Sequence, residues 1–386
     1  MNRVIENNLQ IGENYDFVCL SHLRWDFVYQ RPQHLLSRFA RENRVFFFEE
    51  PIFFDGETHL NISPREDNLF VLVPHISHAD RETKNVTDIQ REMLEEMLNE
   101  QNIKDFVLWF YTPMAMDFAR HLQPAVTIFD CMDELSAFKF APPELIENEK
   151  NLLEKADLVF TGGQSLYEAK KEKHKRVFPF PSSIDAAHFN QARNITEETT
   201  DQQSIAQPRL GYCGVIDERL DIDLIGEVAA MRPDWQFVMI GPVVKINEAD
   251  LPRHDNIHYL GGKNYQELPA YLAGWDVALM PFALNESTKY ISPTKTPEYL
   301  AAGKPVVSTP IRDVVRPYGD LNLVHIASTA EEFVAACEKA LEENRDEKLK
   351  RIDEFLSQIS WDKTFSEMAD LIKNAMPENG TKLANA

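Results

Sequence analysis

One stretch of the chain reads SPTKTPEYLAAGKPVV and runs from Ser292 to Val307. Serine is a common N-cap and proline suits the first helical position, so the stretch predicts a helix that begins at Ser292 and Pro293. Gly303 is suited to end this helix, and the apolar residues that follow predict a buried strand. A loop, a helix and a strand in this order are typical of an α/β fold.

The predicted helix would carry two charged side chains close to its N-terminus. Free N–H groups at a helix N-terminus attract a phosphate, and Lys295 would add a positive charge beside that anion. Glu298 would lie one turn further on, where its carboxylate could accept hydrogen bonds from a ribose diol. The spacing alone is equally consistent with a surface ion pair, because residues three apart on a helix are neighbours.

Short apolar segments alternate with helical patterns on both sides of this stretch. Apolar strands separated by helices predict a parallel sheet that is covered on both faces. The candidate strands of the first half cover residues 15–20, 44–48, 69–73, 106–110, 126–129 and 158–160. Those of the second half cover residues 210–213, 235–240, 257–260, 277–280, 305–308 and 323–326.

The two runs of strands predict two consecutive α/β domains. The segment NQARNITEETTDQQSIAQ, residues 190–207, is polar and lacks hydrophobic periodicity, so it is interpreted as an interdomain linker and hinge. We therefore expect an N-terminal domain over residues 1–190 and a C-terminal domain over residues 205–360. An amphipathic helix over residues 361–375 is expected to return to the first domain, and the tail PENGTKLANA is expected to be disordered.

The charge balance excludes one class of partner. The chain has 386 residues, with 40 Lys and Arg against 62 Asp and Glu, which gives a formal charge of −22. An acidic surface repels a phosphate backbone, so nucleic acid is excluded as a partner, and broad adhesion to an anionic membrane is disfavoured. The basic run at residues 170–176 leaves a weak peripheral membrane contact open, although a solvated helix end is the favoured interpretation.

Several familiar site types have no support in the sequence. None of the four cysteines belongs to a C-x-x-C pair, and there is no G-x-G-x-x-G motif, so zinc, dithiol and dehydrogenase chemistry are not indicated. Asp221 and Asp223 form a D-x-D motif, but a helix is expected to begin there, so a cap is favoured over a metal site. No apolar run reaches the ~20 residues of a membrane span, and a cytoplasmic location is expected.

The run SPTKTPEYLAAGKPVVSTP resembles the C-terminal signature of glycosyltransferase family 4, whose members have the GT-B fold. Other segments occur in the same order in that family, namely DLVFTGGQS at 157–165, FPSSID at 180–185, GYCG at 211–214 and NIHYLG at 256–261. The blocks WDFVYQRPQHL at 25–35 and FDCMDE at 129–134 resemble a bacterial subgroup of cell-surface polysaccharide synthesis, the teichuronic-acid type. The resemblance implies two Rossmann-like domains that face each other.

The resemblance also implies roles for residues of the C-terminal half. Glu298 matches the second Glu of the family motif and would hold the nucleotide ribose, whereas Tyr290 stands where the family has the first Glu. Lys295 and Glu298 are candidate catalytic residues that act on the donor. The expected donor-binding residues are Gly214, Arg219, Gly241, Pro242, Gly261, Gly262, Lys263, Tyr290, Ser292, Pro293 and Thr294.

The N-terminal half offers candidates for the sugar and the acceptor. Asp130 and Asp133 follow the predicted strand at 126–129 and are candidate catalytic carboxylates, with helix capping as the alternative. Trp25, Gln30 and Arg31 are candidate acceptor contacts, because sugars stack on Trp and Arg pairs with phosphate or carboxylate. Trp25 is otherwise an ordinary core aromatic residue.

These observations predict a hexosyltransferase that uses a nucleoside-diphosphate sugar, preferably a UDP-sugar. Its acceptor would be the hydroxyl of a glycan or a lipid-linked precursor in cell-surface polysaccharide synthesis. The family resemblance implies retention of configuration, and neither a metal nor another cofactor is expected. Two alternatives stay open: a nucleotide-sugar 2-epimerase on the same architecture, and a non-catalytic nucleotide-sugar-binding subunit, which the missing first Glu keeps open.

Overall fold

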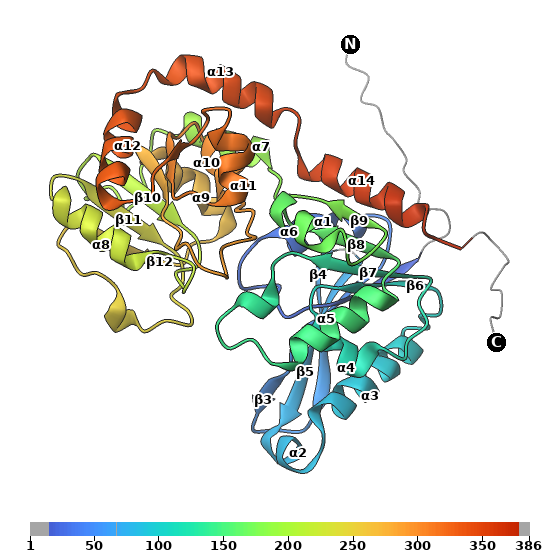
Figure 1. Cartoon of the computed structure of the whole chain (residues 1–386). Helices are drawn as coiled ribbons and strands as arrows, with labels where there is room; N and C mark the ends of the chain where they lie inside the picture. Colours follow the sequence, from blue (N-terminus) through green and yellow to red (C-terminus); the bar gives the residue numbers. More distant parts are fainter. Residues whose placement is uncertain (1–14, 67, 378–386) are drawn as a thin grey trace.

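The computed structural model describes residues 15–66 and 68–377, and the tail for which the sequence predicts disorder lies almost entirely outside them. The described residues form two sheets, one of nine strands and one of six. Each sheet lies between helices, as the apolar strand patterns predict (Figure 1). The two sheets belong to two Rossmann-like domains.

The first sheet has the strand order β3-β5-β2-β1-β6-β7-β8-β9, with β4 paired to β5. All its pairs are parallel except β4 with β5. The central strands are buried on both faces, which requires the continuous apolar runs that the sequence shows. The strands are β1 Asp16–Leu20, β2 Val45–Phe48, β3 Ile52–Phe54, β4 His59–Glu66, β5 Leu69–Ser77, β6 Phe106–Phe110, β7 Val126–Cys131, β8 Leu158–Thr161 and β9 Val177–Pro179.

The second sheet is wholly parallel, in the order β12-β11-β10-β13-β14-β15. The register pairs Cys213 with Ile240, so β10 and β11 end side by side. Ligands of open parallel sheets bind at the carboxyl ends of such strands. The strands are β10 Arg209–Cys213, β11 Gln236–Ile240, β12 Ile257–Gly261, β13 Val277–Met280, β14 Val306–Ser308 and β15 His325–Ile326.

Helices cover both sheets. Those around the first sheet are α1 Arg31–Phe39, α2 His78–Thr83, α3 Val86–Glu100, α4 Met116–Ala119, α5 Glu144–Lys155, α6 Gln164–Lys170 and α14 Trp361–Lys373. Those around the second are α7 Ala186–Phe189, α8 Ile222–Met231, α9 Leu268–Ala273, α10 Lys295–Ala301, α11 Arg312–Val314, α12 Ala330–Glu342 and α13 Arg345–Leu356.

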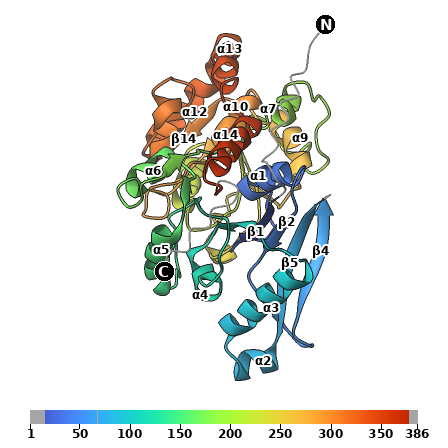
Figure 2. The same ribbon diagram turned by 90° about the vertical axis from the view of Figure 1, so that its right-hand side faces the viewer.

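The last helix, α14, lies against α1 of the N-terminal domain (Figures 1 and 2). Trp361, Met368 and Ile372 of α14 are buried in the same apolar cluster as Phe39 of α1. The chain thus crosses between the domains twice, near residues 180–185 and again between α13 and α14. The two crossings touch, because the Trp361 N–H donates to the Ile184 carbonyl at 3.3 Å.

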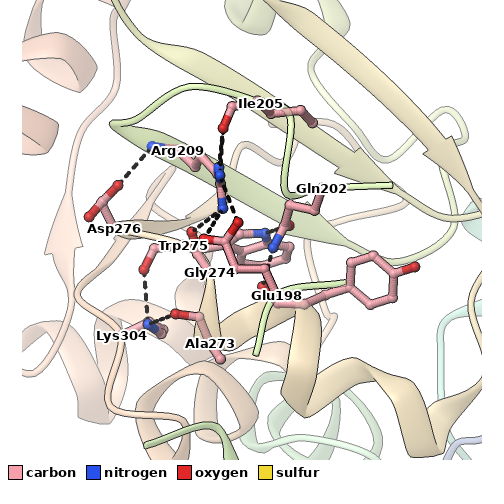
Figure 3. A network of polar contacts seen from close by, with 10 residues as sticks. Glu198, Gln202, Ile205, Arg209, Ala273, Gly274, Trp275, Asp276 and Lys304 are labelled. Atoms are coloured by element: carbon pink, nitrogen blue, oxygen red, sulfur yellow. Dashed lines mark hydrogen bonds and ion pairs between the residues drawn. The ribbon is translucent and has the colours of Figure 1, made fainter. Parts of the chain in front are cut away.

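The polar segment at residues 190–207 does not span the gap between the domains but packs on the C-terminal domain (Figure 3). Gln202 is fully buried; it donates to the Tyr271 carbonyl and accepts a hydrogen bond from the Trp275 indole. Arg209 binds Glu198 at 2.8 Å and the Ile205 carbonyl. The polar side chains therefore bond to the domain surface, which explains why a segment without hydrophobic periodicity is ordered there.

Candidate active site

The two domains face each other across a cleft that contains two adjoining chambers. The larger chamber has a volume of about 500 Å³ and the smaller about 150 Å³, and Val28, Gly214 and Val215 line both. Residues 25–29 of the N-terminal domain line the larger chamber opposite the ends of β10, β11 and β12. The cleft therefore lies where the strand-end rule places the ligand of an α/β protein.

Two glycines let the chain come close at the floor of the cleft. Gly214 has a φ of +156°, and a Cβ there would lie 2.1 Å from Cε of Lys295. Gly241 has a φ of +146°, and a Cβ there would lie 1.8 Å from the Gly214 carbonyl oxygen. Both positions need glycine, since any other side chain would displace Lys295 or separate the ends of β10 and β11.

Helix α10 begins at Lys295 with Thr294 as its N-cap, two residues later than the sequence predicts. Ser292 and Pro293 lie in the preceding loop and line the smaller chamber with Thr294. Thr296 N–H already donates to the Pro293 carbonyl at 3.2 Å, and Pro297 has no N–H. The N-terminus of α10 thus offers fewer free donors to a phosphate than a helix starting at Pro293 would, and Lys295 supplies the charge.

Lys295 and Glu298 lie close to each other and have no hydrogen-bonding partner. Tyr299 fixes the helix that carries them, since its hydroxyl accepts from Cys213 N–H at 2.7 Å and donates to the Cys213 carbonyl at 3.2 Å. Within residues 15–66 and 68–377, neither the Lys295 ammonium nor the Glu298 carboxylate makes a hydrogen bond or a short ion pair. Two half-buried charged groups are therefore left available to a ligand.

The burial of this pair changes its protonation. Burial raises the pKa of Glu298 from 4.5 to about 7, and the nearby Lys295 charge opposes the rise. Burial also lowers the pKa of Lys295, while Glu298 opposes the fall. Both groups would recover favourable interactions if a ligand supplied hydroxyls to the carboxylate and negative charge to the ammonium.

Arg219 lines the smaller chamber, as expected of a phosphate contact, but it is already engaged. Its guanidinium binds the buried Asp217 carboxylate through two nitrogens, at 2.6 to 3.1 Å. It also lies 5.6 Å from the centre of the Phe138 ring of the N-terminal domain. Arg219 is therefore held in place, with part of its charge neutralised before any ligand arrives.

Asp133 lines the smaller chamber, whereas Asp130 does not face it. Asp130 is fully buried and forms an ion pair with Arg31 at 2.9 Å, and Arg31 also donates to the Phe180 carbonyl at 2.7 Å. Burial raises the pKa of Asp130, and Arg31 opposes the rise. Two residues that the sequence assigns separately, Asp130 to catalysis and Arg31 to the acceptor, are thus each other's partner, and neither head group is free.

The other N-terminal candidates also have structural roles. Trp25 is buried, packs edge-on against Phe47, and its backbone N–H donates to Glu49 at 2.7 Å. Its remaining surface lines the larger chamber. Gln30 lines the smaller chamber and caps α1 through a reciprocal pair of bonds with Gln33.

The remaining donor-site candidates divide into two groups. Gly241, Pro242, Gly262 and Lys263 line the larger chamber, and Gly261 accepts a hydrogen bond from Gly241 N–H. The Lys263 ammonium is paired with Asp201 at 2.6 Å. Tyr290, the other group, packs against an apolar cluster of the N-terminal domain. The position where the family has its first glutamate is therefore a contact between the two domains in this protein.

Two tyrosines that the sequence did not single out lie in the larger chamber. Tyr29 of the N-terminal domain stacks on Tyr265 with ring centres 4.5 Å apart, and His188 covers the other face of Tyr265 at 4.4 Å. The Tyr265 hydroxyl is buried and has no partner among the described residues. The contact joins residues 236 positions apart (265 − 29), so no local signal could have indicated it.

Two of the weaker motifs have structural explanations. Asp221 caps α8 by accepting the Leu224 N–H at 2.9 Å, as expected for a cap. No group of three or more potential metal ligands occurs among residues 15–66 and 68–377. In the basic run, Lys170 is fully buried between Glu134 and Glu149, which reduces the charge available to a membrane.

Comparison with known proteins identifies the C-terminal half. Residues 207–343 match the family model described as "Glycosyl transferases group 1". The C-terminal domain is therefore similar to the glycosyl transferases group 1 family over these residues. The match contains Gly214, Arg219, Lys295 and Glu298, so every candidate donor contact of the smaller chamber on this side of the cleft lies in the family domain.

A curated protein of Bacillus subtilis (strain 168), described as "Putative teichuronic acid biosynthesis glycosyltransferase TuaH", is 27% identical over 254 residues. The match covers 58% of this chain and 61% of that protein, so the similarity spans less than two thirds of the relative. This relative is of the subgroup that the N-terminal motifs indicate.

Solved structures confirm the GT-B fold over nearly the whole chain. A sucrose-phosphate synthase from Thermosynechococcus elongatus superposes with a TM-score of 0.69 at 14% identity, over 94% of this chain and 99% of that one. A trehalose-6-phosphate protein from E. coli bound with UDP-2-fluoro glucose gives 0.68 at 12% identity, over 94% and 100%. At these identities the likeness establishes the fold. Within the described part of the chain, no helix is long and apolar enough to cross a membrane.

Proposed function

We propose that the protein is a glycosyltransferase that moves a sugar from a nucleoside-diphosphate sugar to a hydroxyl of a glycan or lipid-linked acceptor. The observation that carries the proposal is the pair of Lys295 and Glu298 at the carboxyl end of β10, inside the group 1 match, where neither head group hydrogen-bonds to another described residue. A half-buried cation and a half-buried carboxylate side by side match the diphosphate and the ribose diol of one nucleotide.

In this proposal the donor spans both chambers. The nucleoside occupies the larger chamber against Tyr265 and the ends of β11 and β12, and the diphosphate reaches Lys295 and Arg219 in the smaller one. UDP is the favoured nucleotide, because the similar E. coli structure carries a UDP-sugar analogue. The role in cell-surface polysaccharide synthesis rests on the similarity to the teichuronic acid relative.

The reaction breaks the bond between the sugar's anomeric carbon and the β-phosphate oxygen, whose electron pair leaves with the nucleoside diphosphate. The acceptor oxygen forms the new bond to that carbon, and its proton leaves on the diphosphate. Lys295 and Arg219 would stabilise the charge that develops on the leaving group. We propose retention of configuration, which the family resemblance implies. We also propose that no metal is needed, because positive side chains can fill the electrostatic role of a cation there.

A binding and product assay tests the proposal. A thermal-shift panel of nucleotide sugars should raise the melting temperature with one donor class, because a ligand that binds only the native state stabilises it. The donor so found should then be consumed in the presence of EDTA, with a product that keeps its anomeric configuration by NMR. If no nucleotide sugar binds, the proposed function is wrong; inversion, or inhibition by EDTA, would refute the retaining, metal-independent chemistry.

A further inference from the structure

A separate cavity of about 350 Å³ lies in the N-terminal domain, and we call it the N-terminal chamber. Residues at the carboxyl ends of β1, β2 and β6 line it, and side chains from α3 and α4 close it. The loop after β1 separates it from the cleft: Ser21 lines the N-terminal chamber, whereas Trp25 lines the larger chamber. The two spaces are thus one loop apart on the same edge of the sheet.

Polar side chains without partners face the N-terminal chamber. Thr87, Gln90 and Glu50 line it, and their side chains make no hydrogen bond to another described residue. The hydroxyls of Ser21 and Thr112 each accept one backbone N–H, at 2.9 and 3.3 Å, which leaves each free to bond once more. The chamber therefore offers hydroxyl, amide and carboxylate groups at once.

Aromatic side chains supply the apolar part of the lining, from Phe48, Phe53 and Phe118. A sugar ring has a hydroxyl-bearing edge and an apolar face, and a site for it needs both kinds of surface. A few convergent polar groups in an otherwise apolar cavity are typical of small-molecule sites. The composition and the volume fit one sugar ring.

The charge of the lining selects among sugars. Glu49, Glu50 and Asp117 line the chamber, and none of its lining residues is a Lys or Arg. Arg24, just outside, binds the Glu49 carboxylate at 2.9 Å and the Glu50 carbonyl at 2.6 Å. Asp117 lies 3.7 Å from the Arg120 guanidinium, so among the described residues Glu50 is the lining carboxylate that forms no ion pair. A phosphate or carboxylate in this chamber would meet the Glu50 carboxylate and no lining cation, and like charges brought together disfavour binding.

We propose that the N-terminal chamber binds a sugar unit of the acceptor, and that this sugar is uncharged or carries an amine. Any phosphate of a lipid-linked acceptor would lie outside the chamber. The assignment of the occupant as the acceptor rests on the proposed function, whereas the binding of a non-anionic sugar does not. It adds to the predicted acceptor residues Trp25, Gln30 and Arg31, which line the cleft chambers. Of these, Trp25 is buried and Arg31 is paired with Asp130.

NMR of the full chain with labelled Met and Leu methyl groups tests this. Met114 lines the N-terminal chamber and Leu268 lines the larger one, so each methyl reports on one site. Methyl glucoside and methyl glucosaminide should shift Met114, and glucose 6-phosphate should bind at least fivefold more weakly. UDP should shift Leu268. Failure of UDP alone would count against the donor site and leave the sugar site standing.

Variants of the lining residues test which side chains bind the sugar. Gln90→Ala should weaken both sugars about three- to tenfold, since one hydrogen bond is lost. Glu50→Gln should weaken methyl glucosaminide about tenfold and methyl glucoside far less, because only the amine loses a charged partner. Glu144→Gln, an exposed glutamate on α5, is the matched control and should change neither. An unmoved Met114 with both sugars, or equal binding of glucose 6-phosphate, would overturn the proposal.

Discussion

Two pairs of a cation and a carboxylate lie at or beside the cleft, one fully buried and one half-buried, and they differ in which groups neutralise their charges. Arg31 and Asp130 bind each other at 2.9 Å, and Arg31 also donates to a backbone carbonyl. Lys295 and Glu298 are near neighbours, yet neither has a hydrogen-bonding partner in the described chain. Buried charges are normally paired, so the first pair is complete as it stands and the second is incomplete without a ligand.

This difference separates stability from binding. Removing one member of a complete buried pair strands the other charge, so the cost falls on folding. Removing one member of an incomplete pair removes a ligand contact, so the cost falls on affinity and rate. The predictions below test whether the two pairs divide in this way.

The largest effect is expected for Arg31→Met. It leaves Asp130 buried without its partner, and breaking such a pair costs about 3–5 kcal/mol of unfolding free energy. Urea denaturation measures the loss. The double variant Arg31→Met with Asp130→Leu should recover most of it, while UDP affinity stays within about twofold.

The Asp130→Asn variant tests whether the Arg31–Asp130 pair also contributes to turnover. It keeps the shape of the side chain, and we expect measurable turnover, because Asp130 faces Arg31 and not the reacting groups. Complete loss of turnover in a stably folded Asp130→Asn protein, together with an inverted product, would make Asp130 the general base and end the distinction between the two pairs.

The second largest effect is expected for Lys295→Ala, and it concerns turnover. Loss of a group that stabilises leaving-group charge lowers turnover by about 100- to 1000-fold. Calorimetry should show a larger loss of affinity for UDP than for uridine, because only UDP carries the diphosphate. Lys289→Ala removes an exposed lysine of the same loop and should change little. Equal losses for UDP and uridine would contradict the assignment.

Local sequence patterns could predict much of this fold. These patterns miss β3, β4 and β9. Strands β3 and β9 have three residues each, and β4 is an edge strand with Pro64 and exposed polar residues and shows no apolar run. The polar segment at 190–207 was misread because its side chains bond to a domain surface, and composition cannot distinguish that from solvation.

The site was harder to predict, because its pairs join distant residues. The resemblance found the residues of the smaller chamber, including Lys295, which the close approach of Gly214 confirms as a neighbour of the β10 end. No pattern could show that Arg31 pairs with Asp130, 99 residues away, or that Tyr29 stacks on Tyr265. The start of α10 was misplaced because Ser292 and Pro293 have helix-start preferences that the loop overrides.

A smaller effect is expected for Glu298→Ala. The carboxylate would accept the ribose hydroxyls, and hydrogen bonds to charged groups contribute about 1.5–3 kcal/mol, so UDP affinity should fall roughly tenfold or more. Isothermal titration calorimetry measures it. Glu286→Ala, an exposed glutamate in the preceding loop, is the control. Affinity unchanged in Glu298→Ala would mean that this pair, like the other, is only structural.

The smallest effect is the pH dependence that Glu298 gives to binding. Its pKa of about 7 means that the carboxylate is mostly protonated at pH 6 and mostly ionised at pH 8. If only the ionised form accepts the ribose hydroxyls, UDP affinity should rise up to about tenfold across that range. The phosphate of UDP also titrates in this range, but the Glu298→Gln protein shares that contribution, so the difference in affinity between the two proteins isolates Glu298.

The free energy of unfolding should change in the opposite direction. Between pH 4.5 and about 7 the native protein keeps a proton on Glu298 that the unfolded chain has released, so this group makes the free energy of unfolding fall as pH rises. Glu298→Gln should remove both the pH dependence of the unfolding free energy and the rise in UDP affinity. If the wild-type protein showed neither pH dependence, Lys295 and Glu298 would form a pair that is complete without a ligand, as Arg31 and Asp130 do.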